Sequence, residues 1–237
     1  MDVPLIQPWA PAPLTARARE GVVDVWRADL AAIGDQLEQL LCKEELERAA
    51  QIVHQRDRVL WARSRGVLRA LLARYLGSDP RELSFELGPH GKPALLSEGP
   101  TRPGPGMDLR MDLSFNLSHS GELALYAVSA KRAVGIDVEL AHRREVDEVA
   151  IAARLLGGDQ ARRLASLDPD ARAREFLRLW VAHEAAVKCR GGELAVSPKD
   201  SHATELWTSA LDVGPRAAAA LAIEGGRCEL RCWQWRD

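Results

Sequence analysis

The chain has 237 residues, enough for one large domain or two small ones; 46% of them are hydrophobic and 28% charged, as in globular proteins. Its formal net charge of −2 gives no reason to expect nucleic acid or an anionic membrane as a partner. Because no apolar run could span a bilayer and the N-terminus lacks a leader pattern, we expect a cytoplasmic protein. Four cysteines have no metal-site spacing and are expected to be reduced thiols: Cys42, Cys189, Cys228 and Cys232.

One long amphipathic helix dominates the first part of the chain. Residues 1–18 are rich in Pro and Ala and predict an irregular lead-in, residues 22–26 alternate like a strand, and residues 33–48 are helical in pattern. Residues 56–76 place apolar side chains at helical spacing, and Gly-Ser-Asp-Pro ends that helix. Arg65 lies on it, either as a planar ligand for phosphate or as an ordinary solvated charge.

A turn rich in Gly and Pro follows a short predicted strand at residues 83–87. It ends in Lys92 and Pro93, where the proline holds the preceding backbone extended and the lysine offers a point charge for phosphate. An ordinary loop lysine is the alternative. Residues 97–106 predict an exposed loop.

Three strands then predict an antiparallel meander at residues 115–120, 123–129 and 134–139. The first reads Phe-Asn-Leu-Ser-His-Ser and ends with Ser118 and His119. There a hydroxyl, a backbone N–H and an imidazole can meet a phosphate, although a lone histidine is more often structural.

Two carboxylates lie two positions apart on the third strand, Val-Gly-Ile-Asp-Val-Glu. Side chains alternate along a strand, so Asp137 and Glu139 share one face roughly 6–7 Å apart, while Ile136 and Val138 point into a core. Neighbouring acids on an apolar strand repel and lose hydration unless a cation lies between them. Oxygen ligands favour a hard ion, Mg²⁺ or Mn²⁺. Two surface acids on an edge strand remain the alternative.

Arg-rich helical patterns at residues 141–174 could receive an acidic partner, although a solvated helix surface is the more common explanation for any single arginine. A second acidic segment lies downstream of them. Residues 176–188 predict a helix on which Trp180, Glu184 and Lys188 line one face. A surface Glu–Lys pair is common, but the shared tryptophan favours a half-buried position in a cleft. Strands are expected at residues 206–209, 217–223 and 227–235.

Taken together, four motifs resemble those of the 4′-phosphopantetheinyl transferases of the larger, Sfp-like class. They are Gly91-Lys92-Pro93, Phe115-Asn116-Leu117-Ser118-His119-Ser120, Gly135-Ile136-Asp137-Val138-Glu139 and Trp180-x-x-His183-Glu184-Ala185-x-x-Lys188, the last followed by Gly191-Gly192. Each is weak alone, but their order and spacing fit the family over residues 90–195. The segment around Arg65, Ser-Arg-Gly-Val-Leu-Arg, also looks like one that many members carry. One position departs, because the family usually has lysine where this chain has His183.

The resemblance implies an α+β fold of two pseudo-symmetric halves, each a small antiparallel sheet packed on a long helix, with the active site in the cleft between them. Residues 1–112 would be the N-terminal half, which makes coenzyme A contacts. Residues 113–237 would be the C-terminal half, which carries the metal and catalytic residues. A monomer is implied as well.

The activity implied is transfer of 4′-phosphopantetheine from coenzyme A to a serine of an apo acyl or peptidyl carrier protein, with release of 3′,5′-ADP and dependence on Mg²⁺, or Mn²⁺. The implied metal ligands are Asp137, Glu139 and Glu184, and the implied catalytic residues are Asp137, Glu184 and Lys188. The implied coenzyme A contacts are Arg65, Lys92, Pro93, Ser118, His119, His183 and Lys188. Whether Glu184 also acts as general base stays open.

The substitution at His183 has an expected consequence. Histidine is mostly neutral above about pH 6.5, so one phosphate contact should become weaker or pH-dependent. Three other hypotheses stay in play: a degenerate member that binds coenzyme A or a carrier without transfer, a Mg²⁺-dependent nucleotide hydrolase, and a scaffold with accidental acids. The sequence does not say which carrier protein is served.

Overall fold

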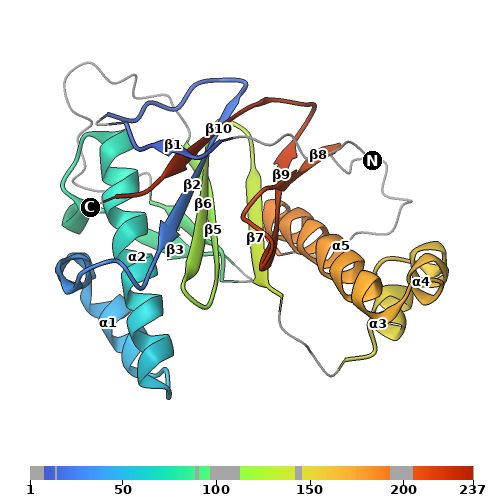
Figure 1. The fold of residues 1–237 in the computed structure, drawn as a ribbon. Helices are drawn as coiled ribbons and strands as arrows, with labels where there is room; N and C mark the ends of the chain where they lie inside the picture. Colours follow the sequence, from blue (N-terminus) through green and yellow to red (C-terminus); the bar gives the residue numbers. More distant parts are fainter. Residues whose placement is uncertain are drawn as a thin grey trace.

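The computed structural model describes residues 8–13, 15–88, 91–96, 113–141, 146–192 and 205–236. Its fold is α+β, with four layers in the order helix, sheet, sheet, helix (Figure 1). Within those ranges no helix combines the length and apolar character needed to cross a membrane. The four cysteines are unpaired by disulfides, as expected.

The first sheet has five strands in the order β1-β10-β2-β6-β5. Their bounds are Ala10–Pro11 for β1, Glu229–Gln234 for β10, Val22–Asp29 for β2, Leu123–Ala130 for β6 and Leu113–Ser120 for β5. β2, β6 and β5 are antiparallel neighbours, but β10 joins β2 in parallel and β1 joins β10 in parallel. The sheet is therefore mixed, and the expectation of a purely antiparallel sheet here was wrong.

Helix α2 (Gln55–Leu76) covers the outer face of this sheet, where residues 56–76 were predicted to be helical. Its apolar stripe forms one buried cluster with Trp26 of β2 and Tyr126 of β6. Gly77 ends the helix in the left-handed conformation, with φ 62°. The helical region expected at residues 33–48 is interrupted, because Leu41 and Cys42 are extended. It forms a 3₁₀ helix η1 (Asp35–Leu40) and the short helix α1 (Lys43–Ala50).

A small hairpin follows α2. A 3₁₀ turn η2 (Pro80–Glu82) leads into β3 (Phe85–Leu87), which pairs with β4 (Pro93–Leu95) in antiparallel register. Phe85 packs edge-on against Phe115 of β5, with ring centroids 5.9 Å apart. This contact brings the segment that carries Lys92 next to the first sheet.

The second sheet is antiparallel, with β7 (Val134–Leu140), β9 (Ala217–Glu224) and β8 (Leu206–Leu211) in that order. Helix α5 (Pro169–Cys189) covers its outer face, and α3 (Glu148–Leu155) and α4 (Gly158–Ala165) pack beside α5 (Figure 1). Gly135 permits the close approach of α5, since a Cβ there would lie 2.1 Å from the Ala185 carbonyl oxygen. Asp137 and Glu139 lie two and four positions after Gly135 on β7. Because successive side chains of a strand point to opposite faces, these two side chains also face α5. Ile136 and Val138 point into the apolar layer between the sheets, as expected.

The two sheets meet along β5 and β7 through side chains. The main-chain partner of β7 is β9, so the predicted three-strand meander was wrong at its third strand. Instead, every second residue of β5 accepts an N–H of β7. Asn116 Oδ1 accepts from Ile136 at 2.9 Å, Ser118 Oγ from Val138 at 3.4 Å and Ser120 Oγ from Leu140 at 3.1 Å. We call this row of contacts the β5–β7 seam.

Each half of the chain, as bounded at residues 112 and 113, contributes one long helix that covers a sheet. The first sheet, however, takes β2 from before that boundary and β5, β6 and β10 from after it. The two halves therefore share a sheet, and the domain boundary stays a prediction.

Candidate active site

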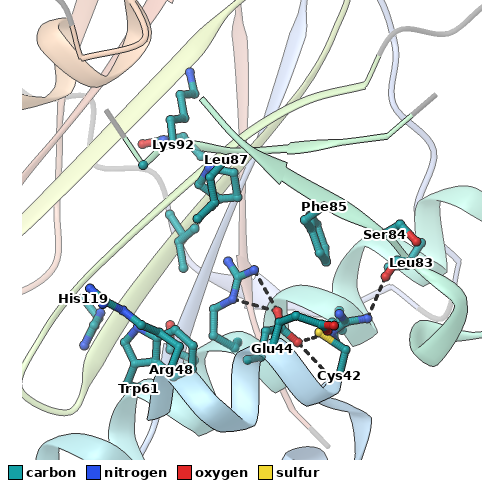
Figure 2. A pocket seen from close by; sticks show the side chains of 18 of the residues that line it. Cys42, Glu44, Arg48, Trp61, Leu83, Ser84, Phe85, Leu87, Lys92 and His119 are labelled. Atoms are coloured by element: carbon teal, nitrogen blue, oxygen red, sulfur yellow. Dashed lines mark hydrogen bonds and ion pairs between the residues drawn. The ribbon is translucent and has the colours of Figure 1, made fainter. Parts of the chain in front are cut away.

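A cavity of about 1100 Å³ opens between α1 and α2 on one side and the β3–β4 hairpin on the other, and it reaches β5 and the end of α5. Figure 2 shows Trp61 and Arg48 on the helical side, with Phe85 and Leu87 on the hairpin. Its volume suits a ligand larger than a simple metabolite.

The cavity has an excess of positive charge. Its lining includes six cationic side chains and two carboxylates: Arg48, Arg65, Arg69, Arg81, Lys92 and Lys188 against Glu44 and Glu45. Such a balance favours an anionic ligand, and the aromatic rings offer surfaces for a planar group.

Arg65 lies in this cavity, where its guanidinium is held by an acid, and its contact with a phosphate stays a prediction. Its Nε and Nη2 donate to Oε1 of Glu45 at 3.0 and 2.8 Å. Arg69, one turn along α2, donates from Nε to Oε2 of the same carboxylate at 2.6 Å. The two guanidiniums lower the pKa of Glu45 although its burial opposes them. Sequence reasoning missed Glu45 and Arg69. The four-residue spacing of Arg65 and Arg69 on one helix could have been recognised in the sequence. The contact with Glu45 could not, because Glu45 lies on another helix.

Lys92 and Pro93 also line the cavity. The Lys92 ammonium is already hydrogen-bonded to two carbonyls, those of Val134 and Lys188, each at 2.9 Å. Burial lowers the pKa of Lys92. Its first role in this structure is to tie the hairpin to β7 and α5, and its contact with a phosphate stays a prediction.

His119 opens on the cavity and is exposed to solvent. The protein around its ring, and after that the Lys188 ammonium, lowers the pKa of the imidazole. At neutral pH it is therefore a neutral hydrogen-bonding group facing the ligand space.

Lys188 connects the cavity to the acidic strand. Its Nζ lies 2.6 Å from Oδ1 of Asp137 and 3.1 Å from Oγ of Ser118, and Ser118 donates to the same Oδ1 at 2.8 Å. Burial raises the pKa of Asp137, and Lys188 offsets part of that rise. The structure thus brings Ser118, Asp137 and Lys188 together, and their roles in catalysis stay predictions.

The other two acids lie on the same layer. Glu139 accepts a hydrogen bond from Ser120 at 3.0 Å. Glu184 is half-buried on α5, one helical turn before Lys188. His183 does not line the cavity, and within the described ranges its buried Nε2 has no hydrogen-bond partner.

The arrangement of the carboxylates supports part of the predicted divalent-cation site. Oδ2 of Asp137 is buried and lacks a hydrogen-bond partner among the described residues, as expected for an oxygen that awaits a cation. Asp137 and Glu139 supply hard oxygen donors on one face of β7. Across the same residues, however, no three His, Cys, Asp or Glu side chains are gathered as a metal site, so the three-acid set stays a prediction.

Comparison with known proteins assigns the chain to a family. The profile described as "4′-phosphopantetheinyl transferase superfamily" matches residues 133–229, and the one described as "4′-phosphopantetheinyl transferase, N-terminal" matches residues 26–131. The 4′-phosphopantetheinyl transferase HetI of Nostoc sp. is 30% identical over 243 residues, which cover 96% of this chain and 98% of the relative. The chain belongs to the 4′-phosphopantetheinyl transferase superfamily.

Two further relatives agree. A 4′-phosphopantetheinyl transferase of Bacillus subtilis is 28% identical over 172 residues, covering 73% of this chain and 69% of the relative. The 4′-phosphopantetheinyl transferase AcpT of Escherichia coli is 35% identical over 124 residues, covering 52% and 55%. The protein is therefore a 4′-phosphopantetheinyl transferase, an enzyme that modifies carrier proteins, and the resemblance seen in its motifs is confirmed.

Proposed function

We propose that this transferase takes its group from coenzyme A and passes it to a serine of an apo acyl or peptidyl carrier protein, with a divalent cation, Mg²⁺ or Mn²⁺, bound at the acidic strand. The serine oxygen bonds to the β-phosphorus of coenzyme A, and the bond from that phosphorus to the bridging oxygen breaks. 3′,5′-ADP leaves, and the serine proton passes to a base. The cationic cavity that connects through Lys188 to Asp137 is the observation that carries this proposal.

The positive charge and the aromatic side chains of the cavity support a place there for the nucleotide end of coenzyme A. Arg65 offers a planar fork to a phosphate, His119 a neutral hydrogen-bonding group, and Lys92 with Pro93 the opposite wall. Trp61 and Phe85 offer faces on which a base can stack.

Asp137, Glu139 and Glu184 are the residues that would hold the cation, which supplies charge neutralisation for the diphosphate. The residues around them do the positioning. Ser118 and Ser120 orient the first two carboxylates by hydrogen bonds. Lys188 neutralises Asp137 and would also neutralise the leaving phosphate. Glu184 is the candidate base for the serine proton, and His183 beside it is a candidate phosphate contact.

Incubation of the enzyme with coenzyme A, Mg²⁺ and a panel of apo acyl and peptidyl carriers tests the proposal by mass spectrometry. We expect a carrier to gain the mass of phosphopantetheine, and the gain to disappear with a chelator or with Asp137→Asn. Release of phosphate without any carrier would instead indicate a nucleotide hydrolase. Binding of coenzyme A without a mass gain on any carrier would indicate a degenerate member, and either result overturns the proposal. The panel also identifies the carrier, and a sizing measurement tests for the monomer.

A further inference from the structure

Glu45 is a buried carboxylate in the wall of the cavity, with only 7% of its surface exposed. It accepts four hydrogen bonds: two from Arg65, one from Arg69 and one from the Cys42 N–H at 3.1 Å. A buried charge is tolerated when it is paired and hydrogen-bonded in this way. The trio of one Glu and two Arg keeps a formal charge of +1.

The two arginines of this trio are not equivalent. Arg69 is 1% exposed and donates from Nη1 to the carbonyls of Pro80 and Leu83, each at 2.9 Å, so its guanidinium is committed to the fold. Arg65 uses only its Nε–Nη2 edge for Glu45. Its Nη1 has no hydrogen-bond partner in the described part of the chain. The Nη1–Nη2 edge of Arg65 is thus left for a ligand.

Aromatic rings restrict Arg65 further. Its guanidinium carbon lies 5.1 Å from the ring centre of Phe85 and 6.0 Å from that of Trp61. A guanidinium held along one edge and packed against rings keeps the other edge in a fixed direction. An arginine side chain otherwise loses considerable rotamer freedom when it binds a ligand.

We propose that Glu45 is a positioning residue that presents Arg65 to a phosphate monoester of the donor, and that it thereby determines selectivity for coenzyme A over dephospho-coenzyme A. This inference rests on the proposed use of coenzyme A. Two adjacent N–H groups of a guanidinium match two oxygens of a phosphate monoester, which carries more charge than either phosphate of a diphosphate bridge. Glu45 also keeps the repulsion between Arg65 and Arg69 from turning Arg65 away.

The test compares Glu45→Gln with the wild-type enzyme, using coenzyme A and dephospho-coenzyme A as donors. Glutamine keeps the shape and one acceptor oxygen but loses the charge that holds both arginines. We expect the ratio of kcat/KM values for the two donors to fall about tenfold, mainly through KM for coenzyme A, as for the loss of one good charge-assisted contact. The rate with dephospho-coenzyme A should change little.

Asp24→Asn is the matched control for a purely structural effect. Asp24 is also a buried carboxylate, 3% exposed, and accepts from Arg231 Nη2 at 2.9 Å and from the Tyr75 hydroxyl at 2.7 Å. It does not line the cavity. We expect it to lower thermal stability as Glu45→Gln does but to leave the donor ratio unchanged. If both variants lose stability and both keep the ratio, the inference is overturned.

Arg65→Lys guards against the case in which Glu45→Gln does not fold. It keeps a cation beside Glu45 but removes the two-pronged edge. We expect the donor ratio to fall as in Glu45→Gln, and an unchanged ratio contradicts the inference. If the wild-type enzyme modifies carriers with coenzyme A but Glu45→Gln and Arg65→Lys keep the wild-type donor ratio, this inference alone is refuted. A wild-type enzyme that modifies none refutes the proposed function itself.

Discussion

The ammonium of Lys188 lies 2.6 Å from Oδ1 of Asp137, so the most buried acid of the site is neutralised by a side chain of the helix that covers it. The opposite oxygen, Oδ2, is buried and without a hydrogen-bond partner among the described residues. Asp137 therefore has one oxygen that is hydrogen-bonded to the protein and one that is available to a cation. Burying a carboxylate oxygen without a hydrogen-bond partner costs free energy, and an acid that served the fold alone would be expected to have both oxygens paired.

Asp137→Asn should separate stability from activity. Because the folded-state pKa of Asp137 is raised, the folded form binds its proton more tightly than the unfolded chain does. Its contribution to stability is therefore greatest below the ordinary carboxyl pKa and declines as pH rises through the raised value. At neutral pH we expect Asn to change the free energy of unfolding by no more than about 1 kcal/mol, while carrier modification falls by about 10²-fold or more.

Chemical denaturation at pH 5 and pH 7, with and without Mg²⁺, measures this. The wild type should gain stability from Mg²⁺ at pH 7, and Asp137→Asn should not. A loss of several kcal/mol in the variant without metal would mean that Asp137 mainly stabilises the fold.

Ser120→Ala should weaken metal binding rather than donor binding. The Ser120 hydroxyl accepts the Leu140 N–H, so its own proton is directed to Oε2 of Glu139 at 3.0 Å. Groups that orient metal ligands typically change metal affinity by tenfold or more, and we expect the Mg²⁺ concentration for half-maximal activity to rise about tenfold. Calorimetric titration with Mg²⁺ alone should show the same shift.

Two variants control this prediction. Ser120→Thr keeps the hydroxyl and should retain the wild-type Mg²⁺ requirement. Ser129→Ala removes a buried serine, whose hydroxyl contacts the Ala130 carbonyl alone at 3.5 Å among the described residues, and should behave likewise. A higher KM for coenzyme A with an unchanged Mg²⁺ requirement in Ser120→Ala would contradict the assignment.

Lys92→Met should loosen the β3–β4 hairpin. Methionine preserves the apolar stem but removes the donor to the carbonyls of Val134 and Lys188, of which the Lys188 carbonyl still accepts the Gly191 N–H at 3.2 Å. We expect the free energy of unfolding to fall by about 1–3 kcal/mol, the cost of leaving the Val134 carbonyl unsatisfied, and hydrogen exchange to accelerate in the hairpin. Unchanged exchange in the hairpin, together with a raised KM for coenzyme A, would show that Lys92 serves the ligand alone.

His183→Lys tests the departure from the family pattern. A histidine carries charge only at mildly acidic pH, whereas lysine carries it throughout the working range. We expect the pH–rate profiles of the wild type and the variant to differ in shape, because histidine and lysine bring different charge to the same phosphate contact. Superimposable pH–rate profiles would remove His183 from the phosphate-binding residues.

Much of the local structure could be predicted from periodicity. The stripe of α2, the alternation of Asp137 and Glu139 on β7 and the helix that carries Lys188 are all confirmed, because each pattern lies within one segment. The parallel pairing of β10 with β2 could not be predicted from any one segment, because the paired residues, such as Val22 and Glu229, lie far apart in the sequence.

The candidate site shows the same division. Arg65, His119 and Lys188 were found from motifs, and the structure places all three on one cavity. Glu45, which holds Arg65, was not found, because its partner lies 20 positions away on another helix. The contact of the Lys92 ammonium with the Val134 carbonyl could not be foreseen either, since backbone acceptors carry no sequence signature.

The position of β10 between β1 and β2 has a consequence for synthesis on the ribosome. β2 emerges early, yet the neighbour on one of its edges is made about 200 residues later. Until then that edge offers unpaired N–H and C=O groups to other chains. The nascent enzyme should therefore depend on chaperones, or on rapid completion, until residues 229–234 have left the exit tunnel.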